Sequence, residues 1–548
     1  MKKFYSLFLF VIAAHYSFSQ TTFNRVYTIL QTNCANSCHN STTLSGNLDM
    51  SGNEQAVHAA LVNATPSTTA AAAKGYKLVD PGDPRNSFLF KKASHGLDAN
   101  FLLDANEGAA MPNGLPAISQ TEREMIRQWI LFGAKDTGTF VNEQTITNFY
   151  VGQGGQPRQQ VLAPPAANEG VQIYWGPLFM PVGLEFEYDC KFKLRNSIVA
   201  DVTRMNVTEN DESHHFAVYK YYKGADTITP PGVNKVNGIA DEAKLFYNAD
   251  VIAQWPNNID LQYPAGTGYL FDSNSIINIT YHLINYNDSI IAAEAYMNIY
   301  YQPHQTSTIP IKTAQIRYGG DQVGDLVIPN TGLDTTFVIN QVEPDSAFFW
   351  NIISMQAHTH KLGKDFNVWT RNANGTKDSL IYNGQYDPTY TFNQGVYIWD
   401  NPPYRSFSPP YPVDLRKGFI HEATFRNNTA NWVGFGLTTA DEMYVTFIVY
   451  YKSEFPTGVT EETFTDNNIK WYPNPVNNTA YVQLNDATNL ENVELKLFDV
   501  LGNEVAKVND ASGGVMKVRM NQLPNGYYIY KLMSNGEVKG TGKIALQK

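Results

Sequence analysis

Cysteine is scarce in this sequence, which has only three: Cys34, Cys38 and Cys190. A small, odd number excludes a disulfide-rich scaffold, so packed cores must stabilise the chain. Basic residues are also in the minority, 40 against 51 acidic ones, which gives a net charge of −11. A partner rich in phosphate needs a basic face, so we expect no nucleic-acid partner. No apolar run reaches the roughly 18 residues that a membrane-spanning helix requires.

The first 20 residues, MKKFYSLFLFVIAAHYSFSQ, combine two lysines with an apolar run from Phe4 to Ala14. Small residues follow at Ser17 and Ser19. This layout is typical of a cleavable secretory signal, so we predict a signal peptide over residues 1–20 and an exported protein.

The remaining chain changes character twice. Apolar residues at helical spacing in TTFNRVYTILQTNC and SQTEREMIRQWILFGA, the latter with Ser119 and Glu122 as a capping box, indicate a small α-helical domain. Alternating stretches such as FAVYKYY, INITYHLINY and MYVTFIVYY then indicate antiparallel strands divided by turns.

We therefore predict a mainly β protein with two tandem antiparallel β-sandwiches between a helical domain and a small β-sandwich. The expected segments are a helical domain at 21–137, sandwiches at 138–303 and 304–455, a linker at 456–469 and a final β domain at 470–548.

The stretch NCANSCHN places Cys34, Cys38 and His39 close together. Two cysteines can form thioethers to the heme vinyl groups while the adjacent histidine binds the iron, although the usual motif has two residues between the cysteines and this one has three. A helix accommodates the extra residue poorly, so the local turn must adjust. The alternative is a Cys34–Cys38 disulfide beside a surface histidine.

The segment EGAAMPNGLPAISQTEREMIRQWILFGA resembles the second half of a small c-type cytochrome domain, in which a loop methionine precedes the last helix. The resemblance implies heme c with His39 as the fifth iron ligand and Met111 as the sixth, a pair that raises the heme potential. Met50 in LDMSG is the rival axial residue, and we expect it to pack in the core instead.

Five of the eleven histidines lie in the β-rich segments: the adjacent pair His214 and His215, then His282, then His358 and His360. Side chains at i and i+2 of a strand share a face, so His358 and His360 would present two imidazoles together. The adjacent pair can reach one metal ion only at a strand end or a bulge, or through different ring nitrogens.

This order of HH, H and HxH, followed by Met443 in GFGLTTADEMY, resembles the copper type II, ascorbate-dependent monooxygenases, which include the peptidylglycine and dopamine hydroxylating enzymes. The resemblance covers about residues 160–452. It implies two copper ions, one bound by His214, His215 and His282 and the other by His358, His360 and Met443. Imidazole serves both oxidation states of copper, and the thioether favours Cu(I).

The resemblance implies hydroxylation of a substrate C–H bond with O₂ at the methionine-bearing copper, while the other copper supplies an electron. An ascorbate-like reductant or a redox protein would be the external electron donor, and the fused heme domain would be an internal route. Gln356, Val445 and Phe447 replace the residues with which peptidylglycine enzymes hold a peptide C-terminus. We therefore expect a small uncharged or aromatic substrate.

Two other interpretations fit the same residues. One is a non-catalytic electron-transfer or copper-binding protein of the cell surface, and the other is a carbohydrate-binding or adhesin-like protein whose histidines are incidental. His304 and His421 have no counterpart in the resemblance, so we expect structural roles for both, and a buried position for Cys190.

The C-terminal stretches WYPNPVNN, LFDVLGNEV and LPNGYYIYKL, with the closing residues Lys543–Lys548, resemble the sorting domain of type IX secretion. The resemblance implies a small immunoglobulin-like sandwich recognised by the secretion machinery, and a secreted or surface location. The alternative is an ordinary immunoglobulin-like module that only packs or binds.

Overall fold

A computed structural model describes most of the chain. The described residues are 20–94, 98–155, 158–255, 258–319, 323–385, 397–399, 402–453, 469–484, 492–499, 502–509, 514–535 and 537–548. The predicted signal peptide, apart from Gln20, and the predicted linker, apart from residue 469, lie outside them. The chain divides into two compact units, Met1–Gly458 and Val459–Lys548, and each is described by itself.

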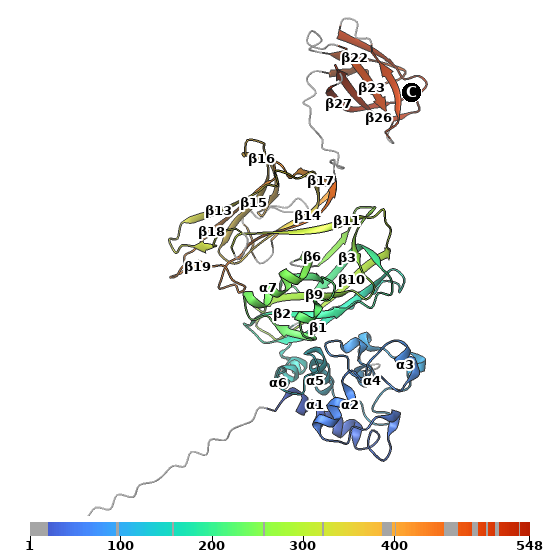
Figure 1. The fold of residues 1–548 in the computed structure, drawn as a ribbon, viewed down its shortest axis with the longest axis vertical. Coiled ribbons are helices and arrows are strands. Elements are labelled where there is room, and N and C mark those ends of the chain that lie inside the picture. Colours follow the sequence, from blue (N-terminus) through green and yellow to red (C-terminus); the bar gives the residue numbers. More distant parts are fainter. Residues whose placement is uncertain are drawn as a thin grey trace, which may run out of the picture. The chain divides into compact units, whose positions relative to one another are not determined.

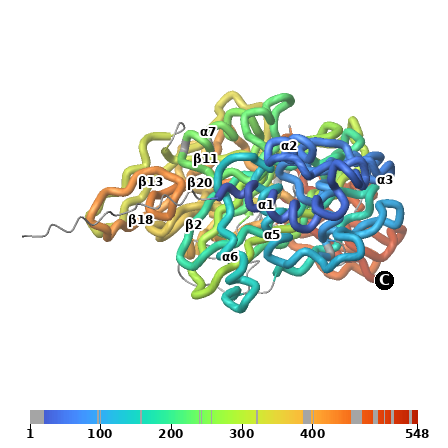
Figure 2. The backbone as a smooth tube through the Cα atoms, turned by 90° about the horizontal axis from the view of Figure 1, so that it is seen from below, coloured from blue at the N-terminus to red at the C-terminus, as the bar shows by residue number. Residues whose placement is uncertain are grey.

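The protein is mainly β, as predicted, and helices are concentrated at the start of the first unit (Figure 1). The helices of this helical region are α1 (Thr22–Leu30), α2 (Glu54–Leu61), α3 (Thr69–Ala73), α4 (Phe88–Ser94), α5 (Gln120–Leu131) and α6 (Glu143–Asn148). Figure 2 shows α1, α2, α3, α5 and α6 gathered into one group. The helical region extends beyond residue 137, where the sequence predicts its end, since α6 follows. The Asn142 side chain caps α6 by accepting from the N–H groups of Gln144 and Thr145.

Helix α5 begins and ends where the sequence predicts. The Ser119 hydroxyl accepts a hydrogen bond from the Glu122 N–H and donates to the Glu122 carboxylate. After its last turn, Gly133 takes a φ of +90°, a conformation that favours glycine. Its apolar side chains join those of α1 in one buried core, which contains Phe23, Phe90 and Trp129.

The central part of the first unit consists of two β lobes. The first β lobe contains α7 (Ile239–Asn248) and ten strands: β1 (Gly170–Met180), β2 (Glu185–Lys193), β3 (Ala200–Glu209), β4 (Ser213–Tyr221), β5 (Gly232–Lys235), β6 (Ala249–Trp255), β7 (Ile259–Gln262), β8 (Thr267–Phe271), β9 (Ile276–Ile284) and β10 (Ile291–Pro303). One sheet has the order β5-β2-β9-β4-β6, and strands β1, β10, β3 and β8 form the facing layer. Side chains from both layers fill a single core.

The second β lobe repeats this two-layer plan. Its strands are β11 (Ile309–Arg317), β12 (Val327–Ile328), β13 (Asp334–Gln341), β14 (Phe349–Thr359), β15 (Gly363–Arg371), β16 (Lys377–Asn383), β17 (Tyr404–Asp414), β18 (Phe419–Arg426), β19 (Val433–Gly434) and β20 (Tyr444–Ser453). The order β11-β20-β14-β17 makes one layer and β13-β18-β15-β16 the other, with β12 and β19 as a separate pair.

The two β lobes share structure instead of meeting as separate modules. Strand β11 pairs in parallel with β8, so a single sheet runs from β1 to β17 through both lobes. The core of the first lobe also contains Ile311, Ile353 and Val449 from the second. The lobes therefore hold a defined relative position, and residues on facing strands can form a common site.

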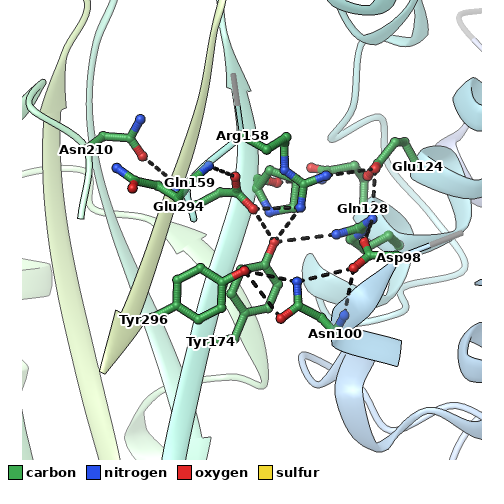
Figure 3. A network of polar contacts seen from close by, with 12 residues as sticks. Asp98, Asn100, Glu124, Gln128, Arg158, Gln159, Tyr174, Asn210, Glu294 and Tyr296 are labelled. Carbon is green, nitrogen blue, oxygen red and sulfur yellow. Dashed lines mark hydrogen bonds and ion pairs between the residues drawn. The ribbon is translucent and has the colours of Figure 1, made fainter. Parts of the chain in front are cut away.

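A buried polar network joins the helical region to the first β lobe (Figure 3). The Arg127 guanidinium on α5 donates to Asp98 at 2.7 Å and to Glu124 at 2.8 Å. Across the junction, Tyr174 of β1 donates to the Glu294 carboxylate at 2.5 Å. Arg158 donates to Glu294 at 2.6 Å and lies 3.6 Å from Glu124, which links the two sides. Because these charges are paired and buried, the helical region is fixed on the lobe.

The second unit is a compact two-sheet module. Its strands are β21 (Ile469–Tyr472), β22 (Thr479–Leu484), β23 (Glu494–Phe498), β24 (Glu504–Val508), β25 (Val515–Arg519), β26 (Gly526–Ser534) and β27 (Glu537–Leu546). One sheet has the order β21-β22-β25 and the other β24-β23-β26-β27, around one apolar core.

No helix among the described residues has the length and apolar character needed to cross a membrane.

Candidate functional site: a five-histidine cluster between the lobes

Five histidines that the sequence singles out converge at the boundary between the two β lobes. The ring centroid of His214 lies 5.6 Å from that of His215 and 5.1 Å from that of His282, all in the first lobe. It also lies 4.8 Å from the ring of His358 and 5.6 Å from that of His360, in the second lobe. The His358 and His360 rings are 5.3 Å apart.

A β-bulge explains how two adjacent histidines reach the same place. In the pairing of β4 with β9, Ser213 lies opposite Leu283 and His215 opposite His282, so His214 is an extra residue in β4. Such a bulge removes the strict alternation of side chains across the sheet. A bulge is one of the three arrangements that the sequence allows for this pair, beside a strand end and coordination through different ring nitrogens.

Two carboxylates of β2 support the histidines of the first lobe. Glu187, His282 and His215 lie directly opposite one another on β2, β9 and β4, so their side chains share one face. His215 Nε2 lies 3.5 Å from the Glu187 carboxylate, and His282 Nε2 donates to Glu185 at 2.8 Å. Acidic groups behind the imidazoles are the usual outer contacts of metal-binding histidines.

Glu185 also connects the two lobes. Its carboxylate accepts hydrogen bonds from the Thr439 N–H at 3.0 Å and the Thr439 hydroxyl at 2.9 Å. Burial opposes ionisation of Glu185, but the hydrogen bonds from His282 and Thr439 outweigh it and lower its pKa to about 2. One carboxylate therefore holds a histidine of the first lobe against the loop that precedes Met443.

In the second lobe, the buried carboxylate of Glu442 fixes the HxH segment. It accepts from the backbone N–H groups of His360 at 3.0 Å, Leu362 at 2.7 Å and Met443 at 3.1 Å. Burial raises the pKa of Glu442 to about 7, and these three N–H groups partly oppose the rise. His360 donates from Nδ1 to the Asp441 carbonyl at 3.1 Å, which leaves Nε2 as the free ligand atom.

Met443 lies just before β20, next to the HxH segment. Thr359 pairs with Tyr444 and His358 with Val445, and just beyond this pairing the N–H groups of His360 and Met443 bond the same Glu442 oxygen. Met443 is buried with Leu437 and Val445 in an apolar cluster. The structure thus brings both histidines of the HxH motif to one face beside Met443.

The clustered imidazoles have the properties of metal ligands. Burial lowers the pKa of His214, His215 and His358 well below that of a free imidazole and lowers the pKa of His360 to about 3, so all four are neutral near pH 7. Each of the five rings keeps at least one buried nitrogen without a hydrogen-bond partner among the described residues. Buried polar atoms of this kind are costly unless something satisfies them, and the donor set suits a copper or zinc ion.

The arrangement differs in one respect from the two separate ligand sets implied by the sequence. Ligand atoms of His214, His358 and His360 all lie within 4.8 Å of one another, although they come from different lobes. The structure therefore forms one continuous cluster instead of two isolated groups, because the shared sheet holds the lobes together.

A second candidate site lies in the helical region, in a partly open cavity of about 160 Å³. Cys34, His39, Met50 and Met111 line it together with apolar side chains such as Leu30 and Ile126. Cys38 is not among the lining residues, and all three cysteines of the chain are unbridged. The cavity is thus bordered by one thiol, one imidazole and two thioether groups, and the second thiol lies outside its lining.

A widened turn accommodates the extra residue between the cysteines. After α1 the chain forms a π-helical turn over Gln31–Ala35, and the His39 N–H bonds the Cys34 carbonyl five residues earlier. His39 donates from Nδ1 to the Ser45 carbonyl at 2.9 Å, which leaves Nε2 available. Burial, together with the Cys38 thiol, raises the pKa of Cys34 to about 11.

Lys92 positions the loop that carries Met111. Its ammonium group donates to the carbonyls of Glu107 and Ala109 at 2.7 and 2.6 Å, and its own carbonyl accepts from the Met111 N–H at 2.9 Å. Met50, the rival ligand, is 1% exposed and belongs to the buried core. Both methionines line the cavity, and both come from loops: the Met50 N–H bonds the His39 carbonyl at 2.7 Å, and the Met111 N–H bonds that of Lys92.

The histidines without a predicted metal role have hydrogen-bond partners elsewhere. His304 bonds the Asp201 carboxylate at 2.7 Å, and His421 lies between the Thr446 hydroxyl and the Gln341 side chain. Cys190 is fully buried in the core of the first lobe, as expected.

Sequence reasoning missed four residues of the histidine cluster: Glu185, Glu187, Glu442 and Trp399. The Trp399 ring lies 5.3 Å from that of His214, edge-on. The sequence does contain a signal for Glu442, because an acidic pair directly precedes the predicted ligand Met443. Glu185, Glu187 and Trp399 have none, because only the fold brings them to the cluster.

Comparison with known proteins identifies the C-terminal unit. Residues 470–547 match the family described as the secretion system C-terminal sorting domain, as the sequence predicted. This domain indicates secretion, attachment at the outer cell surface and interaction with the type IX secretion machinery. No curated protein matches the chain.

Solved structures show only distant likeness. The major capsid protein P2 of bacteriophage PM2 is 10% identical, with 53% of this chain and 99% of that chain covered and a TM-score of 0.21. The glycosylasparaginase PNGase F of Flavobacterium meningosepticum is 11% identical, with 52% and 97% covered and a TM-score of 0.22. No functional conclusion follows from likenesses at this level, and the family match covers only residues 470–547.

Proposed function

We propose that the protein is a secreted copper-dependent monooxygenase that hydroxylates a C–H bond of a small organic substrate with O₂. Electrons would enter through a heme c domain formed by residues 21–137. In this proposal the two β lobes are copper monooxygenase-like sandwiches, with His214, His215, His282, His358, His360 and Met443 as copper ligands.

One observation carries the proposal: five largely buried imidazoles from β4, β9 and the end of β14 lie against one another, and each has a nitrogen that lacks a partner among the described residues. A purely structural cluster would satisfy these nitrogens with hydrogen bonds, as His421 does. Copper bound here would supply the activation of O₂ that C–H hydroxylation requires.

The protein's own residues position the ligands. Glu442 holds the HxH segment and Met443 together through three backbone N–H groups, while Glu185 fixes the ring of His282. Outer contacts of this kind set ring orientation and ligand basicity.

The surroundings of Met443 favour an uncharged substrate. Gln356 lies opposite Phe447, and His358 opposite Val445, so the face that carries the HxH motif continues as amide and apolar side chains. Leu437 and Phe435 extend the apolar surface around Met443. One arginine is nearby: Arg317 of β11 lies opposite Val445, and its guanidinium lies over the Phe246 ring, 4.3 Å from the centroid.

The helical region would serve as the electron entry. Cys34 and Cys38 would attach the heme, with His39 and Met111 as axial ligands. The cavity is part of the same compact unit as the β lobes, and the Arg127–Glu124–Arg158–Glu294 network fixes it there. A fixed position suits repeated one-electron transfer better than a tethered domain does.

The test is turnover by the copper-loaded protein under ¹⁸O₂ with ascorbate and a panel of uncharged aromatic substrates. The proposal predicts a hydroxylated product that carries one ¹⁸O atom and is absent from His360→Ala. Bound copper without any product would favour the non-catalytic electron-transfer alternative. Absence of both copper and heme from the purified protein would contradict the proposal.

A further inference from the structure

Histidine rings of different lobes lie as close together in the cluster as rings of the same lobe. The ring of His214 lies closer to that of His358, at 4.8 Å, than to those of His215 and His282 in its own lobe, at 5.6 and 5.1 Å. Among the described residues, the one group of three metal-ligating side chains whose donor atoms all lie within 4.8 Å is His214, His358 and His360.

We infer that His214, His358 and His360 form a single transition-metal site shared by the two β lobes. His214 projects from the bulge of β4, while His358 and His360 come from the end of β14. The site would take a late first-row ion such as copper or zinc, for which imidazole is a good ligand.

The geometry suits such an ion. Zinc and copper bind imidazole nitrogens at about 2.0 Å, which places tetrahedral ligands roughly 3.3 Å apart. Donor atoms already within 4.8 Å need only small ring rotations to reach that spacing. The three side chains are 2%, 3% and 0% exposed, so the ion would be enclosed.

Each ring has a suitable nitrogen. Both nitrogens of His214 lack a hydrogen-bond partner among the described residues, as do Nε2 of His358 and Nε2 of His360. The Nδ1 of His360 is engaged by the Asp441 carbonyl, so its ring orientation is set before any ion binds. A preorganised ring loses little freedom on binding.

The remaining histidines form a second pair. His215 and His282 lie 5.0 Å apart on neighbouring strands, with Glu187 and Glu185 beside them. The inference therefore moves His214 from the first-lobe set to the second-lobe set. It rests on the proposed function only in that both require these histidines to bind metal, and it holds whether or not the protein oxidises a substrate.

A shared site has a mechanical consequence. An ion held by both lobes would add a link to those already made by the β8–β11 pair and the Glu185–Thr439 hydrogen bonds. Metal binding would then stabilise the contact between the lobes, whereas separate sites would stabilise each lobe alone.

The test is a double-mutant comparison of metal stoichiometry with Zn²⁺. The metal-free full-length protein, its heme retained, is loaded with Zn²⁺, freed of excess by gel filtration and analysed by atomic absorption. A shared site predicts that His214→Ala and His358→Ala each lose one ion and that the double variant loses the same single ion. His358→Ala combined with His282→Ala should lose two.

If His214→Ala and His358→Ala together lose two ions, the shared site is wrong, while the proposed copper function with separate sites stands. If the wild type binds no Zn²⁺ in the cluster, both fail. His421→Gln is the matched control, a buried histidine of the second lobe that should leave the stoichiometry unchanged.

A second measurement covers variants that fold poorly. Co²⁺ added to the metal-free protein gives a visible spectrum that reports the ligand set, and conservative His214→Gln and His358→Gln variants should cause the same spectral loss. Different bands lost in the two variants would overturn the inference.

Discussion

The cavity of the helical region and the histidine cluster between the lobes both gather potential ligand groups, half-buried in the first and mostly buried in the second, but they are assembled differently. Cys34, Cys38 and His39 lie within six residues, and one π-helical turn sets their relation. The cluster draws on segments from residue 185 to residue 443, and it exists only because one sheet runs through both lobes. A local motif defines the first site, and the complete fold defines the second.

This difference predicts which structural changes each site should tolerate. A heme site held, as proposed, by one turn and two thioether bonds should tolerate loosening of the surrounding fold. A site formed between lobes should fail when either lobe, or the contact between them, is disturbed. Four predictions follow from that contrast.

The largest effect is expected from removing both thiols of the local motif. Cys34→Ala combined with Cys38→Ala should abolish covalent heme, because the thioether attachment needs both sulfur atoms. Heme staining after denaturing electrophoresis and the pyridine hemochrome spectrum measure the loss, which should be essentially complete. Metal content of the histidine cluster should not change.

Cys190→Ala is the control, since this thiol lies in the core of the first lobe. Covalent heme that persists in the double variant would show that the motif does not attach it.

The second prediction concerns Glu209, which is 1% exposed at the end of β3. Burial raises its pKa to about 8 from 4.5, and the hydroxyls of Ser213 and Tyr281 only partly oppose the rise. Between these two pH values the folded state keeps a proton that the unfolded state has lost. Stability should therefore fall as pH rises from about 4.5 to 8, by on the order of 3–5 kcal/mol, and level off above.

Denaturant unfolding of the first unit from pH 5 to 9, followed by tryptophan fluorescence, measures this slope. Glu209→Gln should flatten it. Covalent heme should stay attached at every pH. As the pH rises, the wild type should lose the metal of the histidine cluster before it unfolds completely. An unchanged slope in the variant would contradict the assignment to Glu209.

The third prediction tests the support of the HxH segment. Glu442→Gln replaces an acceptor of three backbone hydrogen bonds with a side chain that has one acceptor oxygen. Metal affinity of the cluster should fall by about 10- to 100-fold, the usual cost of losing an outer contact. Competition with a chromophoric chelator measures the affinity.

Glu422→Gln is the matched control, because this carboxylate of the same lobe pairs with Lys377 and not with the HxH segment. Equal losses in both variants would indicate a general effect on the lobe.

The smallest effect is expected at the proposed sixth ligand of the heme. Met111→Leu should keep the covalent heme but lower its reduction potential and remove the absorption of methionine-ligated ferric heme, because the thioether stabilises the reduced iron. Spectroelectrochemical titration measures both. Met50→Leu should leave potential and spectrum unchanged, and the reverse result would make Met50 the ligand.

Much of the fold could be predicted from local pattern. Helices α1 and α5, the capping of α5 by Ser119 and the mainly β character of the rest follow from spacing and turn residues. The bulge at His214 could also be anticipated, since two adjacent histidines cannot share a face of a regular strand. The pairing of β8 with β11 could not, because nothing in either strand specifies a partner in another lobe.

The sequence by itself determined the donor groups: which residues carry thiols, imidazoles and a thioether, and that the C-terminal segment is a sorting domain. It also indicated that the turn at Cys34 must depart from a regular helix, and the structure shows the form of that turn, with a hydrogen bond from the His39 N–H to the Cys34 carbonyl. Only the tertiary structure decided that His214 lies against His358, that Glu185 bonds both His282 and Thr439, and that Glu442 accepts from three N–H groups. The reason is physical: these contacts form between strands far apart in the chain, and burial in a shared core fixes their distances.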